Sequence, residues 1–384
     1  MIIDYDKYIK YEVDLVPVRH KKKDLFKINV RLSPTYRQKI DSIGQMDRTI
    51  GSFVLSMQDY LELVQEAHSV NAHWSTKIEG NNMSLREVQE SSRRIIRSRG
   101  IVVAEDPGPN QEILNHLYAY FLPNSFELPW SLDTVSYVHR ILMNRTGEEC
   151  IPGRIREDAT EEMCIMADDQ VMFECCPSIH VKTELEQLLD WISNSPLDRI
   201  VMATVFFHEF ESIHPFTEGN GRVGRSLFHI LMQELGYSNF NMCKIEDKLL
   251  GNSSVYYNLI RYTDKSGDYT ALIEFFVDCI YAAYSEAVRE YGEKDVLKGL
   301  DENSKVIATM ARKKRDWFSL MDANEWVDGI GSQSVRSRLN DLVDKQVIEK
   351  RGSTRSLVYR FNDPFRPIKE ALVKNQGNDG TDVN

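Results

Sequence analysis

The sequence predicts a mainly α-helical protein with one short β-hairpin and a small α+β domain near its C-terminal end. Three observations predict this fold class. Apolar residues recur at the helical period over most of residues 57–290. Within that stretch, short apolar runs characteristic of strands occur near residues 157–175, and a distinct order of helices and strands follows residue 300. A chain of 384 residues allows two or three domains of ordinary size.

The composition is that of an ordinary globular protein. With 42% hydrophobic and 27% charged residues, the chain is too apolar to be disordered. The 47 Lys and Arg against 58 Asp and Glu give a formal net charge of −11, which excludes a basic nucleic-acid-binding character for the whole chain. We find no secretory signal and no apolar window that could span a membrane, so we expect a cytoplasmic protein without a membrane partner. The six scattered cysteines fit a reducing compartment, and adjacent Cys175 and Cys176 do not have the usual zinc-ligand spacing.

Residues 1–110 are expected to form an N-terminal helical region. Its main helix, at about 54–79, has an apolar stripe from Met57 to Ile78 with one gap at Asn71, and Gly80 follows as a C-terminal cap. A second helix should run from Leu85 to about Arg99.

Residues 111–295 are expected to form the second domain. Residues 157–175 carry short apolar runs broken by Asp168 and Asp169, which is typical of a β-hairpin. Helical patterns cover residues 111–121, 132–143, 182–193, 197–213, 222–235, 253–264 and 269–290.

Residues 300–362 have the order of a winged helix-turn-helix: helices at 304–313, around 323–327 and at 332–344, then two strand-like runs around Gly352. Residues 301–361 carry 12 basic and 9 acidic residues, so this segment is net positive although the chain is acidic. Winged helices dock on DNA and on proteins, and the charge favours neither. The final residues, 363–384, are expected to be a disordered tail.

The segment 208–225, HEFESIHPFTEGNGRVGR, carries the candidate chemistry. Pro215 ends an apolar helix, and the glycines of the Gly219–Gly221 turn can aim successive backbone N–H groups at one point. With the following helix N-terminus and two arginines, this turn is an anion site suited to phosphate. Glu218 lies inside that cationic loop, where Mg²⁺ could join it to phosphate. His214 at the rim could accept a proton.

The residues HPFTEGNGRVGR match the Fic motif HPFx(D/E)GNGRxxR at every specified position. Roughly residues 130–285 resemble the Fic family, including PGRIR at 152–156 before the family's flap and VYYNLI at 255–260 in a later helix. The resemblance implies a Fic-type helical bundle with the hairpin as flap. It also implies transfer of AMP from ATP to a Ser, Thr or Tyr hydroxyl of an unknown target protein and of the chain itself.

The resemblance implies a role for each motif residue. His214 would be the general base, and Glu218 would hold Mg²⁺, with Mn²⁺ as an alternative. Asn220 would orient the α-phosphate, Arg222 would contact phosphate and brace the loop, and Arg225 would hold the γ-phosphate. The implied anion-hole and phosphate-binding residues are Thr217, Gly219, Asn220, Gly221, Arg222 and Arg225.

The resemblance also bears on two further features, the adenine pocket and the flap. Tyr256 matches a tyrosine that lines the pocket, and Asp264 stands where an asparagine is often found. An aspartate could still accept a hydrogen bond from the adenine amino group. Cys175-Cys176-Pro177 stands where the family usually has a proline pair, which leaves the flap register and the target type open.

Ser75 to Gly80, STKIEG, fits the Fic inhibitory motif (S/T)xxxE(G/N). Ser75 and Glu79 are four residues apart and therefore share one helix face. The resemblance implies that Glu79 pairs with Arg225 and removes the γ-phosphate ligand. An inhibitory helix N-terminal to the motif defines class II of the family, whose members often form homodimers.

Two alternatives stay open at this point. The chain could be a DNA-binding regulator whose Fic domain senses nucleotide. It could also be a Fic enzyme that uses another nucleotide or removes AMP from a target.

Overall fold

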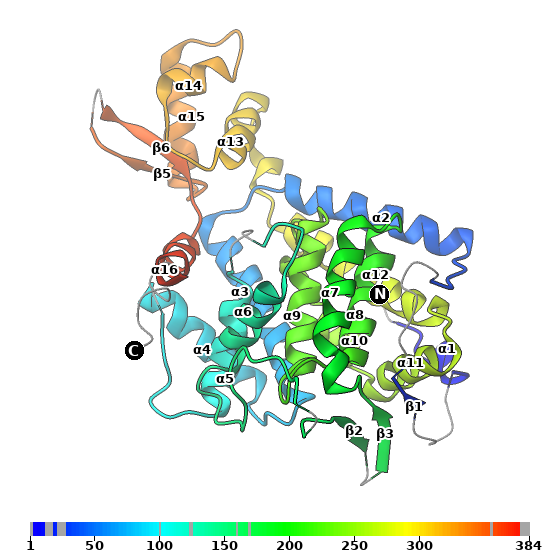
Figure 1. Cartoon of the computed structure of the whole chain (residues 1–384). Coiled ribbons are helices and arrows are strands. Elements are labelled where there is room, and N and C mark those ends of the chain that lie inside the picture. The colour runs from blue at the N-terminus through cyan, green and yellow to red at the C-terminus, as the bar shows by residue number, and fades with distance from the viewer. Residues whose placement is uncertain are drawn as a thin grey trace.

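The computed structural model describes residues 3–11, 18–20, 28–99, 101–122, 126–158, 160–167, 170–353 and 356–376. The described chain is mainly helical, as predicted (Figure 1). The α-helices are α1 (Asp6–Ile9), α2 (Pro34–Ser52), α3 (Met57–Lys77), α4 (Leu85–Ser98), α5 (Pro109–Ala119), α6 (Leu132–Met143), α7 (Ser178–Asn194), α8 (Arg199–Ile213), α9 (Asn220–Glu234), α10 (Glu246–Leu250), α11 (Ser253–Ser266), α12 (Thr270–Glu293), α13 (Glu302–Lys314), α14 (Leu320–Glu325), α15 (Ser332–Asp344) and α16 (Arg366–Gln376). Two short 3₁₀ helices are η1 (Phe240–Met242) and η2 (Val296–Gly299). The strands are β1 (Val18–Arg19), β2 (Cys164–Ala167), β3 (Gln170–Glu174), β4 (Phe318–Ser319), β5 (Ile348–Arg351) and β6 (Val358–Phe361). Among the described residues, none of these helices combines the length and the apolar character that a bilayer crossing requires.

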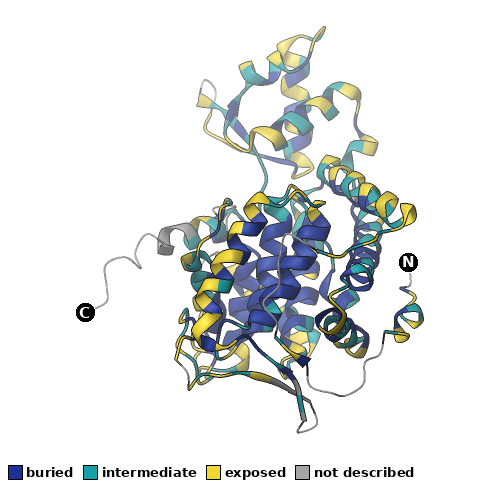
Figure 2. Ribbon diagram, turned by 45° about the vertical axis from the view of Figure 1, so that its right-hand side comes forward, coloured by how far each residue is buried: buried dark blue, intermediate teal, exposed yellow. Residues whose placement is uncertain are grey.

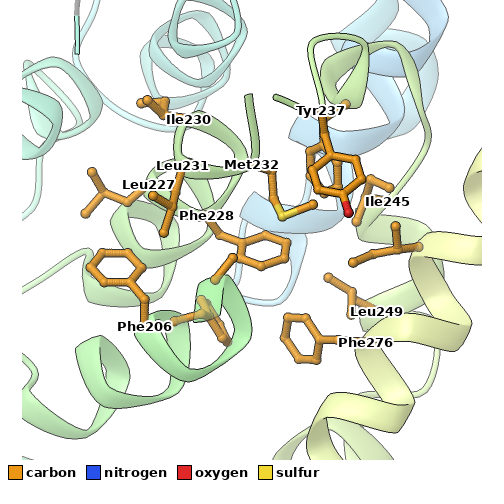
Figure 3. Packing of buried hydrophobic residues seen from close by; sticks show 14 of the residues in the cluster. Phe206, Leu227, Phe228, Ile230, Leu231, Met232, Tyr237, Ile245, Leu249 and Phe276 are labelled. Carbon is orange, nitrogen blue, oxygen red and sulfur yellow. The ribbon is translucent and has the colours of Figure 1, made fainter. Parts of the chain in front are cut away.

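Helices α8, α9 and α12 form the buried centre of the main body. Helix α8 is apolar on nearly every side, which is the pattern of a helix surrounded by others, and Figure 2 shows such buried helices in the middle of the molecule. Phe206, Phe228 and Phe276 bring one aromatic ring from each of the three helices into the shared core (Figure 3). The rings of Phe228 and Phe276 meet edge to face at 5.4 Å between centroids. The turn between α8 and α9 therefore joins two helices that are packed in a rigid core.

Helix α3 is fixed to this body by a polar contact inside the core. Ser56 caps its N-terminus by accepting a hydrogen bond from the backbone N–H of Asp59. The fully buried Asn71 side chain accepts from the N–H groups of Ile245 and Glu246 and donates to the carbonyl of Cys243. Asn71 is the gap in the apolar stripe, and it holds α3 against the start of α10.

The predicted hairpin is formed by β2 and β3, which pair antiparallel with a bulge between Ile165 and Met166. An additional strand, β1, pairs parallel with β3, opposite Val18 and Phe173, and gives the strand order β1-β3-β2. Strand β1 was not predicted, because two residues of parallel pairing leave no local pattern in the sequence. Residues 168 and 169, the predicted hairpin tip, lie outside the described residues.

The C-terminal unit has the predicted order of elements: α13, α14, α15, then β5 and β6, with the two-residue strand β4 added to the sheet. It has its own core, which includes Ile307, Phe318, Leu339 and Tyr359. In Figures 1 and 2 this unit lies at the end of the molecule opposite the β2–β3 hairpin. The assignment of this unit as a winged helix stays a prediction.

The chain beyond residue 363 differs from the expected disordered tail. Helix α16 covers Arg366–Gln376, and Phe365 and Ile368 are each only 1% exposed. The ring of Phe365 lies 5.2 Å from that of Phe121, measured between centroids. The polar composition of the last residues suggested a tail, but the apolar residues before them dock on the body. Residues 377–384 lie outside the described residues.

The predicted boundary at residue 110 does not separate two cores. One continuous cluster of buried apolar residues includes Val64 and Ala72 of α3, Leu114 of α5 and Phe207 of α8. The N-terminal helices are therefore packed as part of the same body as α8 and α9.

Candidate active site

The turn between α8 and α9 is built by backbone constraints. His214 ends α8 in the left-handed conformation, with φ 54°, and its N–H donates to the carbonyl of Phe210 at 2.9 Å. Gly219 has φ 77° and directly precedes α9, and a Cβ at this position would lie 2.4 Å from the sulfur of Met143. A side chain at Gly219 would therefore be strained by the backbone conformation and would require the Met143 side chain to move.

Asn220 closes this turn with its side chain. Its Oδ1 accepts from the N–H of Phe216 at 2.8 Å, and its Nδ2 donates to the carbonyl of the same residue at 2.8 Å. The resemblance implied that Asn220 orients the α-phosphate. In the structure both polar groups of its amide hold the loop, and Asn220 is only 3% exposed.

Arg156 stabilises the same loop through hydrogen bonds to backbone carbonyls at its start. It is fully buried and donates hydrogen bonds to the carbonyls of Ile213 and His214 at the end of α8 and to that of Cys176 at the end of the hairpin. Helix ends leave such carbonyls without intrahelical partners, and Arg156 satisfies them. Arg156 lies in the segment PGRIR, but nothing in the sequence indicated this role.

His139 on α6 stabilises the loop at Glu218. Its Nδ1 accepts from the N–H of Gly153 at 2.7 Å, so the proton lies on Nε2, which donates to the carbonyl of Glu218 at 3.0 Å. The ring stacks on Phe216 at 3.7 Å between centroids. Burial lowers the pKa of His139 to about 4, so the ring is neutral near pH 7. No motif in the sequence pointed to this residue.

One ring nitrogen of His214 is a hydrogen-bond acceptor. Its Nδ1 lies 3.2 Å from the carbonyl of Glu211, to which it donates, so the unprotonated nitrogen is Nε2. Burial lowers the pKa of His214 to about 4, and the contact with the Glu211 carbonyl only partly offsets this effect. The imidazole is therefore neutral near pH 7, which is the state that a general base requires.

Arg222 is held by carboxylates that sequence reasoning missed. Its guanidinium donates to Glu112 at 2.6 Å and to both carboxylate oxygens of Glu148 at 2.5 and 2.8 Å. Asn81, in the turn after α3, donates to the other oxygen of Glu112 at 2.6 Å. Arg222 therefore joins the start of α9 to Glu112 and Glu148 and, through Glu112, to the chain that follows α3.

Arg225 is held by the predicted inhibitory residues. It donates to the hydroxyl and carbonyl of Ser75, each at 2.8 Å, and to the Glu79 carboxylate at 2.6 Å. A Cβ on Gly221 would lie 2.3 Å from that carboxylate, so Glu79 covers the first turn of α9. Gly80 makes the turn that follows, with φ 96°. Burial alone would raise the pKa of Glu79, but the charge and hydrogen bond of Arg225 outweigh it and hold the pKa below its usual range.

Glu211 is a third carboxyl group, after Glu112 and Glu148, that sequence reasoning missed. A Cβ on Gly224 would lie 2.3 Å from its Oε1, an atom that is buried and has no hydrogen-bond partner in the described part of the chain. Burial raises the pKa of Glu211 to about 8, and nearby Arg225 only partly opposes this effect. Glu211 is therefore largely protonated near pH 7 and adds little negative charge beside the arginine.

Glu218 stands at the exposed rim of the loop, and Thr217 beside it is half-buried. Desolvation and the nearby Glu148 carboxylate raise the pKa of Glu218. A divalent cation bound to Glu218 would stabilise its ionised carboxylate and so oppose the desolvation and the repulsion by Glu148. Carboxylate oxygen is the ligand type that Mg²⁺ prefers. The donor chemistry of this position therefore fits the predicted metal.

The structure does not bring the two predicted adenine residues together. Tyr256 is 2% exposed near the start of α11 and packs against Phe207. Asp264 lies two helical turns further on, about 12 Å along the axis. Its carboxylate is 3.4 Å from Nε2 of His208, whose other nitrogen is 2.9 Å from Glu209. Asp264 is thus part of a buried polar network, which also explains the buried histidine on α8.

Comparison with known proteins identifies the segment that contains this loop. Residues 129–232 match the Fic/DOC family. This segment is a Fic domain. It contains the whole turn between α8 and α9.

Relatives of the Fic domain carry a consistent name. The protein adenylyltransferase fic-1 of Caenorhabditis elegans is 26% identical over 184 residues, which cover 46% of this chain and 34% of the relative. A probable protein adenylyltransferase of Aquifex aeolicus is 38% identical over 64 residues, covering 16% of this chain and 20% of the relative. The chain thus spans about a third of the length of the first of these curated relatives and a fifth of the second.

A solved structure confirms the fold. The crystal structure of a Fic family protein from Desulfovibrio desulfuricans superposes with a TM-score of 0.55 at 21% identity and covers 88% of this chain and 98% of that one. The predicted mainly α Fic-type bundle is therefore confirmed.

Proposed function

We propose that this chain is a protein adenylyltransferase, which transfers AMP from ATP to a Ser, Thr or Tyr hydroxyl of a target protein and of itself. The observation that carries the proposal is the turn between α8 and α9, where a neutral His214 stands beside the glycine-rich start of α9. The names of the relatives that match the Fic domain support the same reaction.

The residues of the loop would each have a separate role in an in-line transfer. His214 Nε2 accepts the proton of the target hydroxyl as its oxygen attacks the α-phosphorus and pyrophosphate leaves. The backbone N–H groups at the start of α9 would stabilise charge on the phosphate oxygens. Glu218 would hold Mg²⁺, which supplies positive charge to the phosphates. Arg156, His139 and Asn220 contribute by fixing the loop, because this chemistry depends mainly on position and electrostatics.

Isotopic labelling tests the reaction. The Glu79→Gly variant, incubated with Mg²⁺, should acquire label from α-labelled ATP and none from γ-labelled ATP. Glu79→Gly combined with His214→Ala should acquire neither. Incorporation of label from γ-labelled ATP would indicate phosphoryl transfer and contradict the proposal. If Glu79→Gly incorporated neither label, the proposal would also be contradicted.

We further propose that the wild-type chain is autoinhibited, as in class II of the family. Arg225 is the ligand expected for the γ-phosphate, and Ser75 and Glu79 occupy its donor groups. Removing the Glu79 carboxylate takes away the charged partner of Arg225 and leaves only its neutral contacts with Ser75. The initial rate of labelling in Glu79→Gly should therefore exceed the wild-type rate by more than about tenfold, the effect of about 1.4 kcal/mol of coupling. Glu105→Gly, at an exposed loop position, is the matched control and should leave the rate unchanged.

We propose as a second function that the C-terminal unit is a winged helix that binds DNA. Exposed Arg336 on α15 and exposed Lys350 and Arg351 on β5 favour this use, since such positions contact the groove and the phosphates. Arg338 is less available because it pairs with Asp301, and Arg355 lies outside the described residues.

A gel-shift assay tests the second function. The full chain should retard genomic DNA fragments, and Arg336→Ala with Lys350→Ala should weaken the shift. A shift that is the same in the variant, or absent in the wild type at low salt, would contradict DNA binding by this surface. Retardation without any labelling in Glu79→Gly would instead favour the regulator that senses nucleotide.

A further inference from the structure

Three residues from distant parts of the sequence lie close together beside the C-terminal end of α8. His20 directly follows β1, Cys176 lies between the hairpin and α7, and Glu184 lies on α7. One ligand atom from each of these residues lies within 4.8 Å of the others. We propose that His20, Cys176 and Glu184 bind one divalent transition-metal ion of the zinc type.

The donor set suits such an ion. Imidazole nitrogen, thiolate sulfur and carboxylate oxygen are the three ligand types that Zn²⁺ takes in proteins, and sulfur disfavours Mg²⁺ and Ca²⁺. The side chains of His20 and Glu184 are 4% and 12% exposed, and Cys176 is fully buried. Three protein ligands leave the fourth tetrahedral position for water or another ligand.

His20 is oriented as metal-binding histidines usually are. Its Nδ1 hydrogen-bonds the hydroxyl of Ser212 at 2.8 Å, which directs Nε2 toward Glu184 Oε2 at 2.8 Å. Ligating histidines characteristically use the second ring nitrogen in this way, because the outer hydrogen bond fixes the ring. Metal binding replaces the contact between Nε2 and Glu184 and releases the proton of the Cys176 thiol.

The proposed site is distinct from the predicted magnesium ligand, Glu218. It lies where β1, the base of the hairpin and the end of α8 meet. The N–H of His20 donates to the carbonyl of Glu174 at 2.7 Å, and the N–H of Cys176 donates to that of Ser212 at 3.3 Å. The ion would therefore fasten β1, a strand of only two residues, to the edge of β3.

Cobalt spectroscopy tests the site without relying on enzyme activity. Metal-free full-length protein carrying Glu218→Gln, which removes the other predicted metal ligand, is titrated with Co²⁺. We expect one equivalent to bind with visible bands of tetrahedral cobalt and a near-ultraviolet thiolate-to-cobalt charge-transfer band. Cys176→Ser should abolish the charge-transfer band, and His20→Gln and Glu184→Gln should each weaken binding by more than about tenfold.

The matched controls are Cys164→Ser, His180→Ala and Glu186→Gln, which alter exposed residues of the same types near the same elements. Each should retain the wild-type spectrum and stoichiometry. Circular dichroism confirms that every variant is folded before titration. The absence of a charge-transfer band in the parent protein, or its persistence in Cys176→Ser, would overturn the proposal and leave a hydrogen-bonded His–Glu pair.

Hydrogen exchange supplies a second readout. Zn²⁺ should slow amide exchange in residues 18–20 and 170–174 of the parent protein, because the ion joins these segments. It should have no such effect in Cys176→Ser. Equal exchange with and without Zn²⁺ in the parent would contradict the proposed role in fastening β1.

Discussion

At the scale of single residues, the reactive state of His214 follows from its surroundings. The Glu211 carbonyl fixes the tautomer, and burial keeps the ring neutral. The motif in the sequence located His214, but neither the tautomer nor the supporting residues Arg156 and His139 could be inferred from it. The tautomer depends on how the His214 ring is turned toward the Glu211 carbonyl three residues earlier. The support by Arg156 and His139 depends on contacts between residues 58 and 79 positions apart, which no local pattern encodes.

The lowered pKa of His214 predicts the pH dependence of the reaction. A general base works in its neutral form, and lowering the pKa of a histidine extends that form to more acidic pH. The rate of labelling by Glu79→Gly should therefore stay level as pH falls below 6.5 and decline only near pH 4. A decline centred near 6.5 would show that the ring titrates as an exposed histidine and would contradict the burial argument. Circular dichroism at each pH distinguishes loss of activity from acid unfolding.

At the scale of elements, the span of α3 could be predicted because its signals are local. Apolar residues follow the helical period and Gly80 makes the turn after it. The cap at Ser56, which starts the helix at Met57 and not at about residue 54, was found only in the structure. Strand β1 and helix α16 could not be predicted in the same way. The first is defined by its partner strand, and the second by the aromatic surface on which Phe365 packs.

The docking of α3 predicts a second way to release the proposed inhibition. Asn71→Ala would leave three buried backbone groups at the start of α10 without partners, which should lower the free energy of unfolding by about 2–4 kcal/mol. Looser docking of α3 should also weaken the contact between Glu79 and Arg225. The labelling rate should therefore rise although Glu79 is intact.

Urea denaturation and α-labelled ATP provide the two measurements. Asn82→Ala, at an exposed position after α3, is the control and should change neither. An Asn71→Ala variant that is destabilised but labels no faster than the wild type would show that inhibition does not depend on how firmly α3 is docked.

At the scale of the whole molecule, the fold class was predictable and the division into domains was less so. Twelve motif residues located the loop, and helical periodicity located most helices. The N-terminal helices nevertheless share one core with α8 and α9, since helix periodicity shows which face is buried but not against what. The overall charge of −11 likewise concealed a basic segment at the end that lies opposite the hairpin.

The central claim is that the Fic domain transfers AMP and that Glu79 restrains this transfer. The most direct measurement is the intact mass of the full chain after incubation with ATP and Mg²⁺. We predict a mass increase of one or more AMP groups in Glu79→Gly, little or none in the wild type, and none when His214→Ala is added to Glu79→Gly. An unchanged mass in Glu79→Gly, or an AMP adduct that survives His214→Ala, would contradict the account.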